Sequence, residues 1–280
     1  MKTLKPTLLT EGLIFPEAPR WRDGKLWLSD IWGHKVLTVD DQGRKTIVAE
    51  IHKRPSGLGF LPDGSLLIST METAELLRLK NGNLTTVANL RPFAKNGCND
   101  MVVDGKGRAY VDGYNPAQPL PTGSIILVTP DGKATEVAKD LVTPNGCCVT
   151  PDGKTFLVNQ MGGDEITAFD IQPDGTLANR RVWAKTEGKP DGLCLDAEGA
   201  AWVGLFELAK FQRILPGGKV THEIHFPKGT WTVAPMLGGK DRKTLYMICS
   251  ITTIEDIVQR GKSKGAVYTA RAEVPGAGWP

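Results

Sequence analysis

The sequence predicts an all-β fold, a six-bladed β-propeller with four-stranded blades that forms a single domain over residues 1–280. Three observations predict it. The turn glycines Gly24, Gly64, Gly107, Gly153 and Gly199 follow one another at intervals of 40, 43, 46 and 46 residues, a second hairpin signal lies within each interval, and helical periodicity is almost absent. Four short strands in a repeat of this length are typical of a propeller blade.

A hairpin with two apolar runs opens each predicted blade. These hairpins are PEAPRWRDGKLWLSD from Pro16, PSGLGFLPDGSLLIST from Pro55, CNDMVVDGKGRAYVDG from Cys98, PNGCCVTPDGKTFLVNQ from Pro144, PDGLCLDAEGAAWVG from Pro190 and the weaker WTVAPMLGGKDRKTLYMICS from Trp231. The second hairpins are DDQGRKTIV, LKNGNLTTV, TPDGKATEV, QPDGTLANRRV and LPGGKVTHEI. Their Asp-Gly, Asn-Gly and Gly-Gly turns are those that tight hairpins need. Each repeat therefore supplies four strands.

The two ends of the chain are expected to close the ring. TLLTEGLIF at 7–15 and GAVYTARAEV at 265–274 both read as strands, and together they complete the sixth sheet. A short helix is expected over 252–261, because Thr252 and Glu255 form a capping-box pattern and Gly261 is a stop signal. We interpret this helix as a solvent-exposed connector; the alternative interpretation is a lid over the channel.

Composition narrows the class of protein. Charged residues make up 23% of the chain and the formal net charge is +3, with Lys and Arg scattered singly, so nucleic acid is not an expected partner. No run approaches the roughly 20 apolar residues of a membrane span, and the N-terminus has no secretory core. The five cysteines are an odd number, and Cys147, Cys148 and Cys194 lie in apolar strands. We therefore expect a cytoplasmic protein, and no segment predicts pairing between subunits.

Polar residues recur where the innermost strand of each blade begins. Ser56, Asn99, Asn145 and Asp191 each stand eight residues before a turn glycine, and Glu17 stands seven before Gly24. The innermost strands of a propeller run along its central channel. Equivalent positions of different blades should therefore converge at the channel mouth.

This convergence predicts a metal site in the central channel, held by Glu17, Asn99, Asn145 and Asp191. Two carboxylates and two amides, with no His or Cys in register, form an oxygen-only set suited to a hard cation. One divalent cation balances the two acids; Ca²⁺ is the expected ion, with Mg²⁺, Mn²⁺ or Zn²⁺ as alternatives. Without a cation, the two carboxylates would raise each other's pKa.

Large side chains follow the second strand of several blades and should line the same mouth. They are Trp32, Tyr114, Met161 and Phe206, with Trp231 from the last blade. Together with Asn99, the first four are the expected substrate-binding residues. The mixture predicts a pocket for an apolar or only partly polar molecule.

The motifs PEAPRW, NDMVVDGKGRAYV, TPNGCCVTPDGKTFLV, AFDIQPDGTLANRRVW and PDGLCLDAEGAAWVG carry a family resemblance. With them the chain resembles the senescence marker protein, gluconolactonase and luciferin-regenerating enzyme family of six-bladed propellers. The resemblance implies that Glu17, Asn145 and Asp191 hold a divalent metal, and that Asn99 contacts substrate or also binds metal. One departure is Gly97, where the sugar lactonases carry an Arg, and their substrate-binding Glu has no secure match. The expected substrate is therefore a lactone less polar than gluconolactone.

We accordingly expect a divalent-metal-dependent hydrolase that opens a lactone, with Asp191 as the general base for the attacking water. Two alternatives stay open. The same ligands could serve a phosphotriester or another ester, and the cation could instead be structural in a ligand-binding propeller without catalysis. No G-x-S-x-G elbow is present, and the four histidines lie outside the register of the strand mouths.

Overall fold

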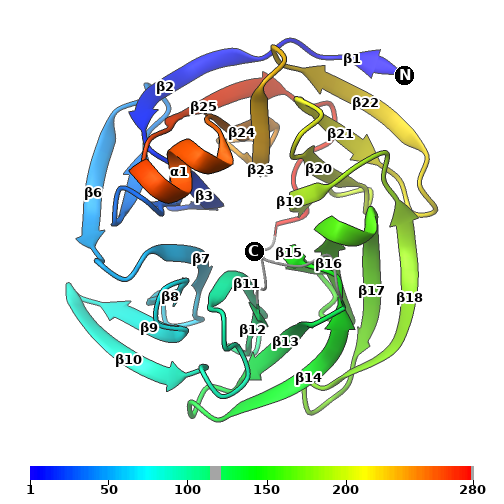
Figure 1. The fold of residues 1–280 in the computed structure, drawn as a ribbon. Helices are drawn as coiled ribbons and strands as arrows, with labels where there is room; N and C mark the ends of the chain where they lie inside the picture. Colours follow the sequence, from blue (N-terminus) through cyan, green and yellow to red (C-terminus); the bar gives the residue numbers. More distant parts are fainter. Residues whose placement is uncertain (114–120, 279–280) are drawn as a thin grey trace.

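The computed structural model describes residues 1–113 and 121–278, which form six sheets around a central axis (Figure 1). The predicted six-bladed propeller with four-stranded blades is confirmed. Each of the first five blades follows the chain from the axis outward, so its first strand is innermost and its fourth lies at the rim.

The strands of these five blades are as follows. Blade 1 holds β3 (Pro16–Arg22), β4 (Lys25–Asp30), β5 (Lys35–Val39) and β6 (Lys45–Glu50), and blade 2 holds β7 (Pro55–Phe60), β8 (Leu66–Thr70), β9 (Glu75–Lys80) and β10 (Asn83–Asn89). Blade 3 holds β11 (Cys98–Val103), β12 (Ala109–Gly113), β13 (Gly123–Val128) and β14 (Ala134–Leu141). Blade 4 holds β15 (Pro144–Val149), β16 (Thr155–Gln160), β17 (Glu165–Ile171) and β18 (Leu177–Lys185), with a short 3₁₀ turn, η1 (Met161–Gly163), and blade 5 holds β19 (Pro190–Leu195), β20 (Ala201–Leu205), β21 (Lys210–Ile214) and β22 (Val220–His225).

Burial follows position in the blade. Every residue of the inner strands β11, β15 and β19 is buried, whereas the outer strand β6 has no buried residue. The inner strands are covered by neighbouring blades on both sides, so they are apolar apart from their first residues. The polar side chains that remain there therefore need a partner or a ligand.

The sixth blade joins the two ends of the chain, as expected. It combines β23 (Thr230–Gly238), β24 (Thr244–Ile251) and β25 (Lys264–Arg271) with β2 (Thr7–Leu13), which pairs antiparallel with β25. The ring of Trp21 in blade 1 stacks on that of Tyr246 in blade 6, with centroids 5.3 Å apart. A further strand that the sequence did not predict, β1 (Lys2–Thr3), pairs parallel with β22 of blade 5.

The expected helix is present as α1 (Ile254–Arg260), although its N-terminus was predicted one residue too early. Thr253 caps it by accepting a hydrogen bond from the backbone N of Asp256 at 3.0 Å, and Thr252 instead donates to the Lys262 carbonyl. Thr252 with Glu255 and Thr253 with Asp256 have the same spacing, so the sequence allows the cap at either threonine. Gly261 ends the helix in a left-handed conformation, as expected.

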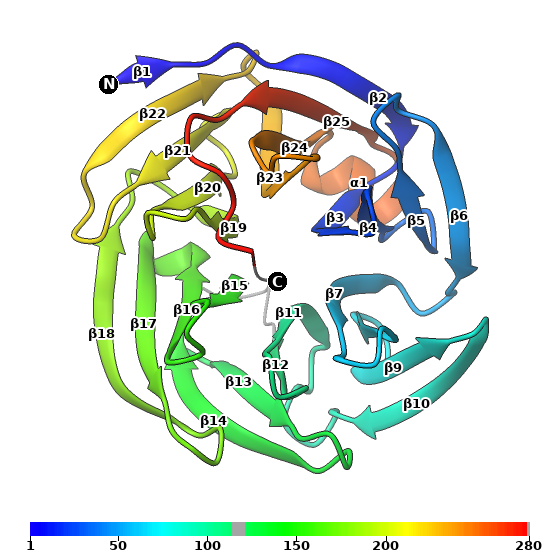
Figure 2. The ribbon, with the colours of Figure 1, turned by 180° about the vertical axis from the view of Figure 1, so that it is seen from behind.

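The two faces of the propeller differ. α1 lies on the face toward the viewer in Figure 1, whereas the C-terminal segment crosses the opposite face toward the axis, as Figure 2 shows. There Ala277 N donates to the Leu195 carbonyl at 3.0 Å, which ties this segment to blade 5. No helix in the described part of the chain is long and apolar enough to span a membrane.

Candidate metal centre at the channel mouth

The inner strands share an irregularity at their first residues. Pairing with the second strand of the blade is interrupted between Pro55 and Leu58, Cys98 and Met101, Pro144 and Cys147, Pro190 and Leu193, and, in blade 1, between Glu17 and Arg20. Bulges of this kind redirect side chains that a regular ladder would alternate. Ser56, Asn99, Asn145 and Asp191 all stand inside these interruptions, and Glu17 stands at the edge of its own.

Glycines let the inner strands of adjacent blades approach closely at this level. Gly146 follows Asn145, and a Cβ built on it would lie 2.5 Å from the backbone oxygen of Asp191. Gly57 follows Ser56 in the same way, and its Cβ would lie 2.6 Å from the backbone N of Met101. Any side chain at these positions would push the strands apart. The glycines therefore help to hold the mouth residues of neighbouring blades together.

A hydrogen-bonded chain links three of the expected site residues across three blades. Ser56 Oγ donates to Asn99 Oδ1 at 2.7 Å, and Asn99 Nδ2 donates to Asn145 Oδ1 at 3.1 Å. Both amides are buried. The structure thus brings these side chains together, as the strand register predicted.

The two acids of the expected cage share one buried environment. Asp191 is 2% exposed, and its Oδ1 has no hydrogen-bond partner; Glu17 is also buried, and its Oε2 accepts from the backbone N of Ala18 at 2.8 Å. Burial, followed by the charge of Asp100, raises the pKa of Glu17 to about 8. Burial, followed by the charge of Glu17, raises the pKa of Asp191 well above its ordinary value.

These donors fit a hard divalent cation. No three His, Cys, Asp or Glu side chains form a metal-binding group within residues 1–113 and 121–278, so two carboxylates alone do not complete a site. The amide oxygens of Asn99 and Asn145 supply the missing donors, since each has a lone pair beyond its present hydrogen bond. A cation here would also satisfy Asp191 Oδ1 and offset the repulsion between the acids.

Sequence reasoning missed a buried ion pair beside this site. Arg20 Nη2 lies 3.3 Å from Asp100 Oδ1 and donates to the Met101 carbonyl at 2.5 Å, joining blade 1 to blade 3. Asp100 follows Asn99 at the place where three other blades carry Gly. That departure from the repeat was the available signal, because a charge inside a buried strand requires a partner.

Asp112 is a further buried acid beside the candidate centre. It lies in β12, is fully buried, and accepts hydrogen bonds from the backbone N of Asn99 at 2.7 Å and of Asp100 at 3.1 Å. These bonds satisfy amides that the bulge of β11 removes from the sheet ladder. Asp112 therefore fixes the backbone from which Asn99 projects.

Two of the predicted rim residues, Phe206 and Met161, contact side chains at the channel mouth. The rings of Phe206 and Trp231 are 4.5 Å apart, and Phe15 meets Trp231 edge-on at 6.2 Å, which forms an aromatic wall. Met161 Sδ lies 4.0 Å from Asn145 Nδ2, so this side chain reaches the candidate centre.

The other two predicted rim residues are Trp32 and Tyr114. Trp32 lies against Arg54, whose guanidinium carbon is 3.9 Å from the Trp32 ring centroid. Tyr114 lies outside the described residues.

Gly97 has no room for the arginine of the sugar lactonases. Its φ is +113°, and a Cβ would overlap the carbonyl oxygen of Met71. A side chain at this position is therefore excluded by the local backbone as well as by the sequence.

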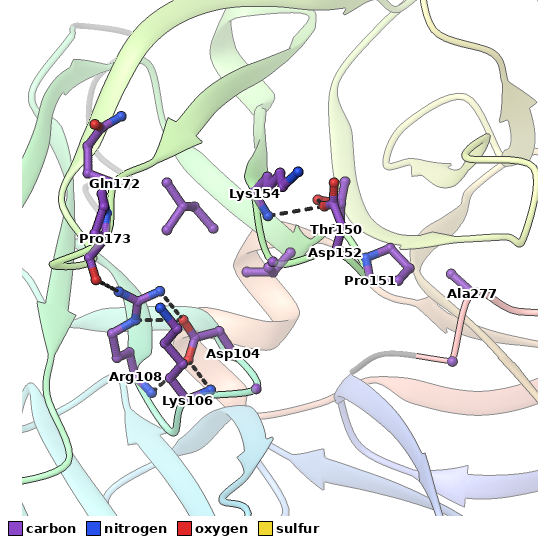
Figure 3. Close-up of a pocket in the computed structure, with 15 residues that line it drawn as sticks. Asp104, Lys106, Arg108, Thr150, Pro151, Asp152, Lys154, Gln172, Pro173 and Ala277 are labelled. Carbon is purple, nitrogen blue, oxygen red and sulfur yellow. Dashed lines mark hydrogen bonds and ion pairs between the residues drawn. The ribbon is translucent and has the colours of Figure 1, made fainter.

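A cavity of about 590 Å³ lies on the opposite face, away from the candidate centre (Figure 3). Turns of blades 3 and 4 and the C-terminal segment line it, and none of the expected metal ligands does. Its one buried cation, Arg108, is held by Asp104 at 2.7 Å and by the Pro173 carbonyl at 3.2 Å. Lys106 and Lys154 are exposed, so their charges do not form a pre-organised anion-binding site in this cavity.

A family model, the SMP-30/Gluconolactonase/LRE-like region, matches residues 15–251. The chain belongs to this family. The matched range contains every residue of the candidate centre from Glu17 to Asp191.

Named relatives agree with this membership. The chain is 23% identical to a 6-deoxy-6-sulfogluconolactonase of Pseudomonas putida, over 100% of this chain and 98% of the relative, and 27% identical to regucalcin of Xenopus laevis, over 93% and 92%. Among solved structures, a calcium-binding protein of Agrobacterium tumefaciens, regucalcin, superposes with a TM-score of 0.79 at 20% identity, covering 98% of both chains. At this identity the superposition shows that the two chains share the fold.

Proposed function

We propose that this protein is a divalent-metal-dependent lactonase. Membership of a gluconolactonase-like family, which includes a named lactonase relative, supports hydrolysis of a lactone. The observation that carries the proposal is the buried, unpartnered Oδ1 of Asp191, beside the amide pair of Asn99 and Asn145. A buried carboxylate oxygen without a partner is costly unless it binds a cation or takes part in chemistry.

Glu17, Asn145 and Asp191 would hold the cation, with Asn99 completing the set. When bound, a divalent cation supplies a Lewis acid that polarises a carbonyl oxygen. We propose Ca²⁺, because all the donors are oxygens and a structural neighbour is named as a calcium-binding protein. Five free, buried cysteines agree with a reducing compartment, and we propose the cytoplasm.

The chain's own residues have separate tasks in the proposed reaction. Asp191 has two carboxylate oxygens, so one would contact the cation while the carboxylate accepts the proton of the attacking water through the other. The chain of hydrogen bonds from Ser56 to Asn99 to Asn145 keeps both amides in one orientation, so little reorganisation is needed when substrate arrives. The aromatic wall of Phe15, Phe206 and Trp231 binds the carbon skeleton and excludes water, which favours a less polar lactone than gluconolactone.

The test is metal-restored lactone opening. Chelator-treated protein is given sugar lactones, aliphatic lactones and one phosphotriester, and acid release is followed before and after Ca²⁺, Mg²⁺, Mn²⁺ or Zn²⁺ is added. We expect a lactone to be opened only with metal, and Asp191→Asn to lower the rate by about 10²-fold or more. Asp152→Asn, an exposed acid on the opposite face, is the control.

Three results would contradict parts of the proposal. Silence toward every lactone, with metal still raising the melting temperature, would favour a structural cation. Hydrolysis of the phosphotriester but of no lactone would show that the protein is a phosphotriester hydrolase instead of a lactonase. Near-full activity of Asp191→Asn with metal bound would remove Asp191 as the base.

A further inference from the structure

The residues one layer outside the candidate ligands form a second ring at the channel mouth. In five blades this position lies two residues before the mouth residue, and its occupants are Phe15, Arg54, Gly97, Thr143 and Lys189. Only two of them are cations. The backbone carbonyls of four of them accept from residues that directly follow the second strand of their blade, so the row lies at the outer edge of the mouth, where a substrate bound at the centre would extend.

The two cations of this ring differ in their partners. Lys189 Nζ lies 2.8 Å from Glu207 Oε2, so its charge is already paired. Arg54 forms no ion pair within residues 1–113 and 121–278, although its neighbour Lys53 is paired with Glu75. Arg54 Nε is buried without a hydrogen-bond partner. A half-buried guanidinium in this state lacks the counter-ion that such groups normally have.

The Arg54 side chain is nevertheless held in place. Its guanidinium carbon is 3.9 Å from the centroid of Trp32, which follows β4 in the adjacent blade. The end of α1 lies close to the same indole, since a Cβ built on Gly261 would be 3.6 Å from Trp32 Cε3. Stacking on an aromatic face fixes the plane of the guanidinium and leaves its N–H edge free to bind a planar or tetrahedral anion.

We propose that Arg54, stacked on Trp32, is a specificity-determining residue that binds an anionic group at the end of the substrate away from the lactone ring. The substrate class is then a lactone whose ring end is less hydroxylated than that of gluconolactone, to suit the aromatic wall, and whose remote end carries a carboxylate, sulfonate or phosphate, because a guanidinium recognises each of these anions through paired hydrogen bonds. The mouth combines an aromatic wall in blades 1, 5 and 6 with this cation between blades 1 and 2. This inference rests on the proposed lactonase function and names its substrate class.

The experiment compares two lactones that differ only at the remote end, γ-gluconolactone and γ-glucarolactone, whose terminal groups are a hydroxymethyl and a carboxylate. The readout is the ratio of kcat/KM for the anionic lactone to that for the neutral one. We expect Arg54→Gln to lower this ratio about 10- to 100-fold, chiefly through KM, and Arg54→Lys to recover part of it. Lys228→Gln removes an exposed cation from the same face and should change the ratio less than about 2-fold, since exposed charges are screened.

The outcomes separate this inference from the function on which it rests. If the metal-loaded wild-type protein opens lactones but Arg54→Gln keeps the wild-type ratio, the role of Arg54 is wrong and the lactonase proposal stands. An equal fall for Lys228→Gln would also overturn it, because general charge would then explain the effect. If the wild-type protein opens no lactone, both proposals fail together. Melting temperatures of the variants show that each one is folded when its ratio is measured.

Discussion

Asn99 and Asn145 belong to different blades, yet Asn99 Nδ2 donates a hydrogen bond to Asn145 Oδ1 at 3.1 Å. The bond uses one lone pair of the Asn145 oxygen and leaves the other free, while Ser56 Oγ uses one lone pair of Asn99 Oδ1. Each amide is thereby prevented from turning its NH₂ group toward a cation. The orientation of both candidate ligands therefore depends on the hydroxyl of Ser56, which is not itself a proposed metal ligand.

Ser56→Ala should therefore weaken the centre without unfolding the blade. We expect Ca²⁺ affinity and lactone-opening kcat/KM to fall about 3- to 10-fold, because Asn99 loses the donor that fixes its orientation. Calorimetric titration with Ca²⁺ measures the first quantity. Ser65→Ala removes a hydroxyl that bonds to Asp63 in the turn between β7 and β8, and should leave both quantities unchanged. An equal loss in the two variants would contradict the role of Ser56.

The stability of the chelator-treated protein should fall as the pH rises. Burial and the charge of Asp100 raise the pKa of Glu17 from 4.5 to about 8. Between these values the folded chain holds a proton that the unfolded chain has released, so the free energy of unfolding decreases through this window. We expect a loss of roughly 2 to 4 kcal/mol between pH 5 and 8.5 from urea unfolding.

Two controls accompany this pH experiment. Glu17→Gln should flatten the dependence, because the group that titrates is gone. Adding Ca²⁺ should recover more stability at the higher pH, where Glu17 is charged. The explanation fails if the Glu17→Gln protein loses stability as steeply as the wild type.

Removing Arg20 should be costly because it leaves Asp100 buried and unpaired. Arg20 Nη2 is 3.3 Å from Asp100 Oδ1, and both side chains are buried. Arg20→Met should lower the free energy of unfolding by about 3 kcal/mol. Adding Asp100→Asn to this variant should recover at least half of the loss, since the stranded charge is then removed. A double variant no more stable than Arg20→Met alone would show that the guanidinium acts through its carbonyl contacts instead.

Gly97→Ala tests why the arginine of the sugar lactonases has no place here. A Cβ at Gly97 would overlap the Met71 carbonyl, whereas one at Gly24, which also has a positive φ, meets nothing within 4 Å. We expect Gly24→Ala to cost about 1 kcal/mol from backbone strain and Gly97→Ala clearly more. Equal losses in chemical denaturation would contradict a steric exclusion at Gly97.

Much of the fold could be predicted because its signals are local and repeat. Gly24, Gly64, Gly107, Gly153 and Gly199 mark equivalent turns, so a residue at a constant distance from each one reaches an equivalent place. That register was enough to bring Asn99 and Asn145 together across two blades. The start of α1 was misplaced, because Thr252 and Thr253 are equally good caps in the sequence and only the fold distinguishes them.

The remaining parts of the site depend on contacts between blades, which no local pattern encodes. Arg20 and Asp100 are separated by 80 residues and meet only because bulges in β3 and β11 redirect their side chains. Trp32 and Arg54 likewise meet between blades, although the sequence had selected Trp32 for its place at the rim. Side chains do not alternate regularly between the two faces of a strand at these bulges, and the candidate ligands lie at the bulges.

The sheet that closes the ring takes β2 from the first residues of the chain and β23 to β25 from the last. On the ribosome, β2 emerges before the strands of the first five blades but has no neighbour until β25 has been made. Five blades can form in order during synthesis, and the sixth must wait until β25 has emerged. A product that stops before β25 therefore leaves β2 as an unpaired edge of an open ring, which is a template for aggregation.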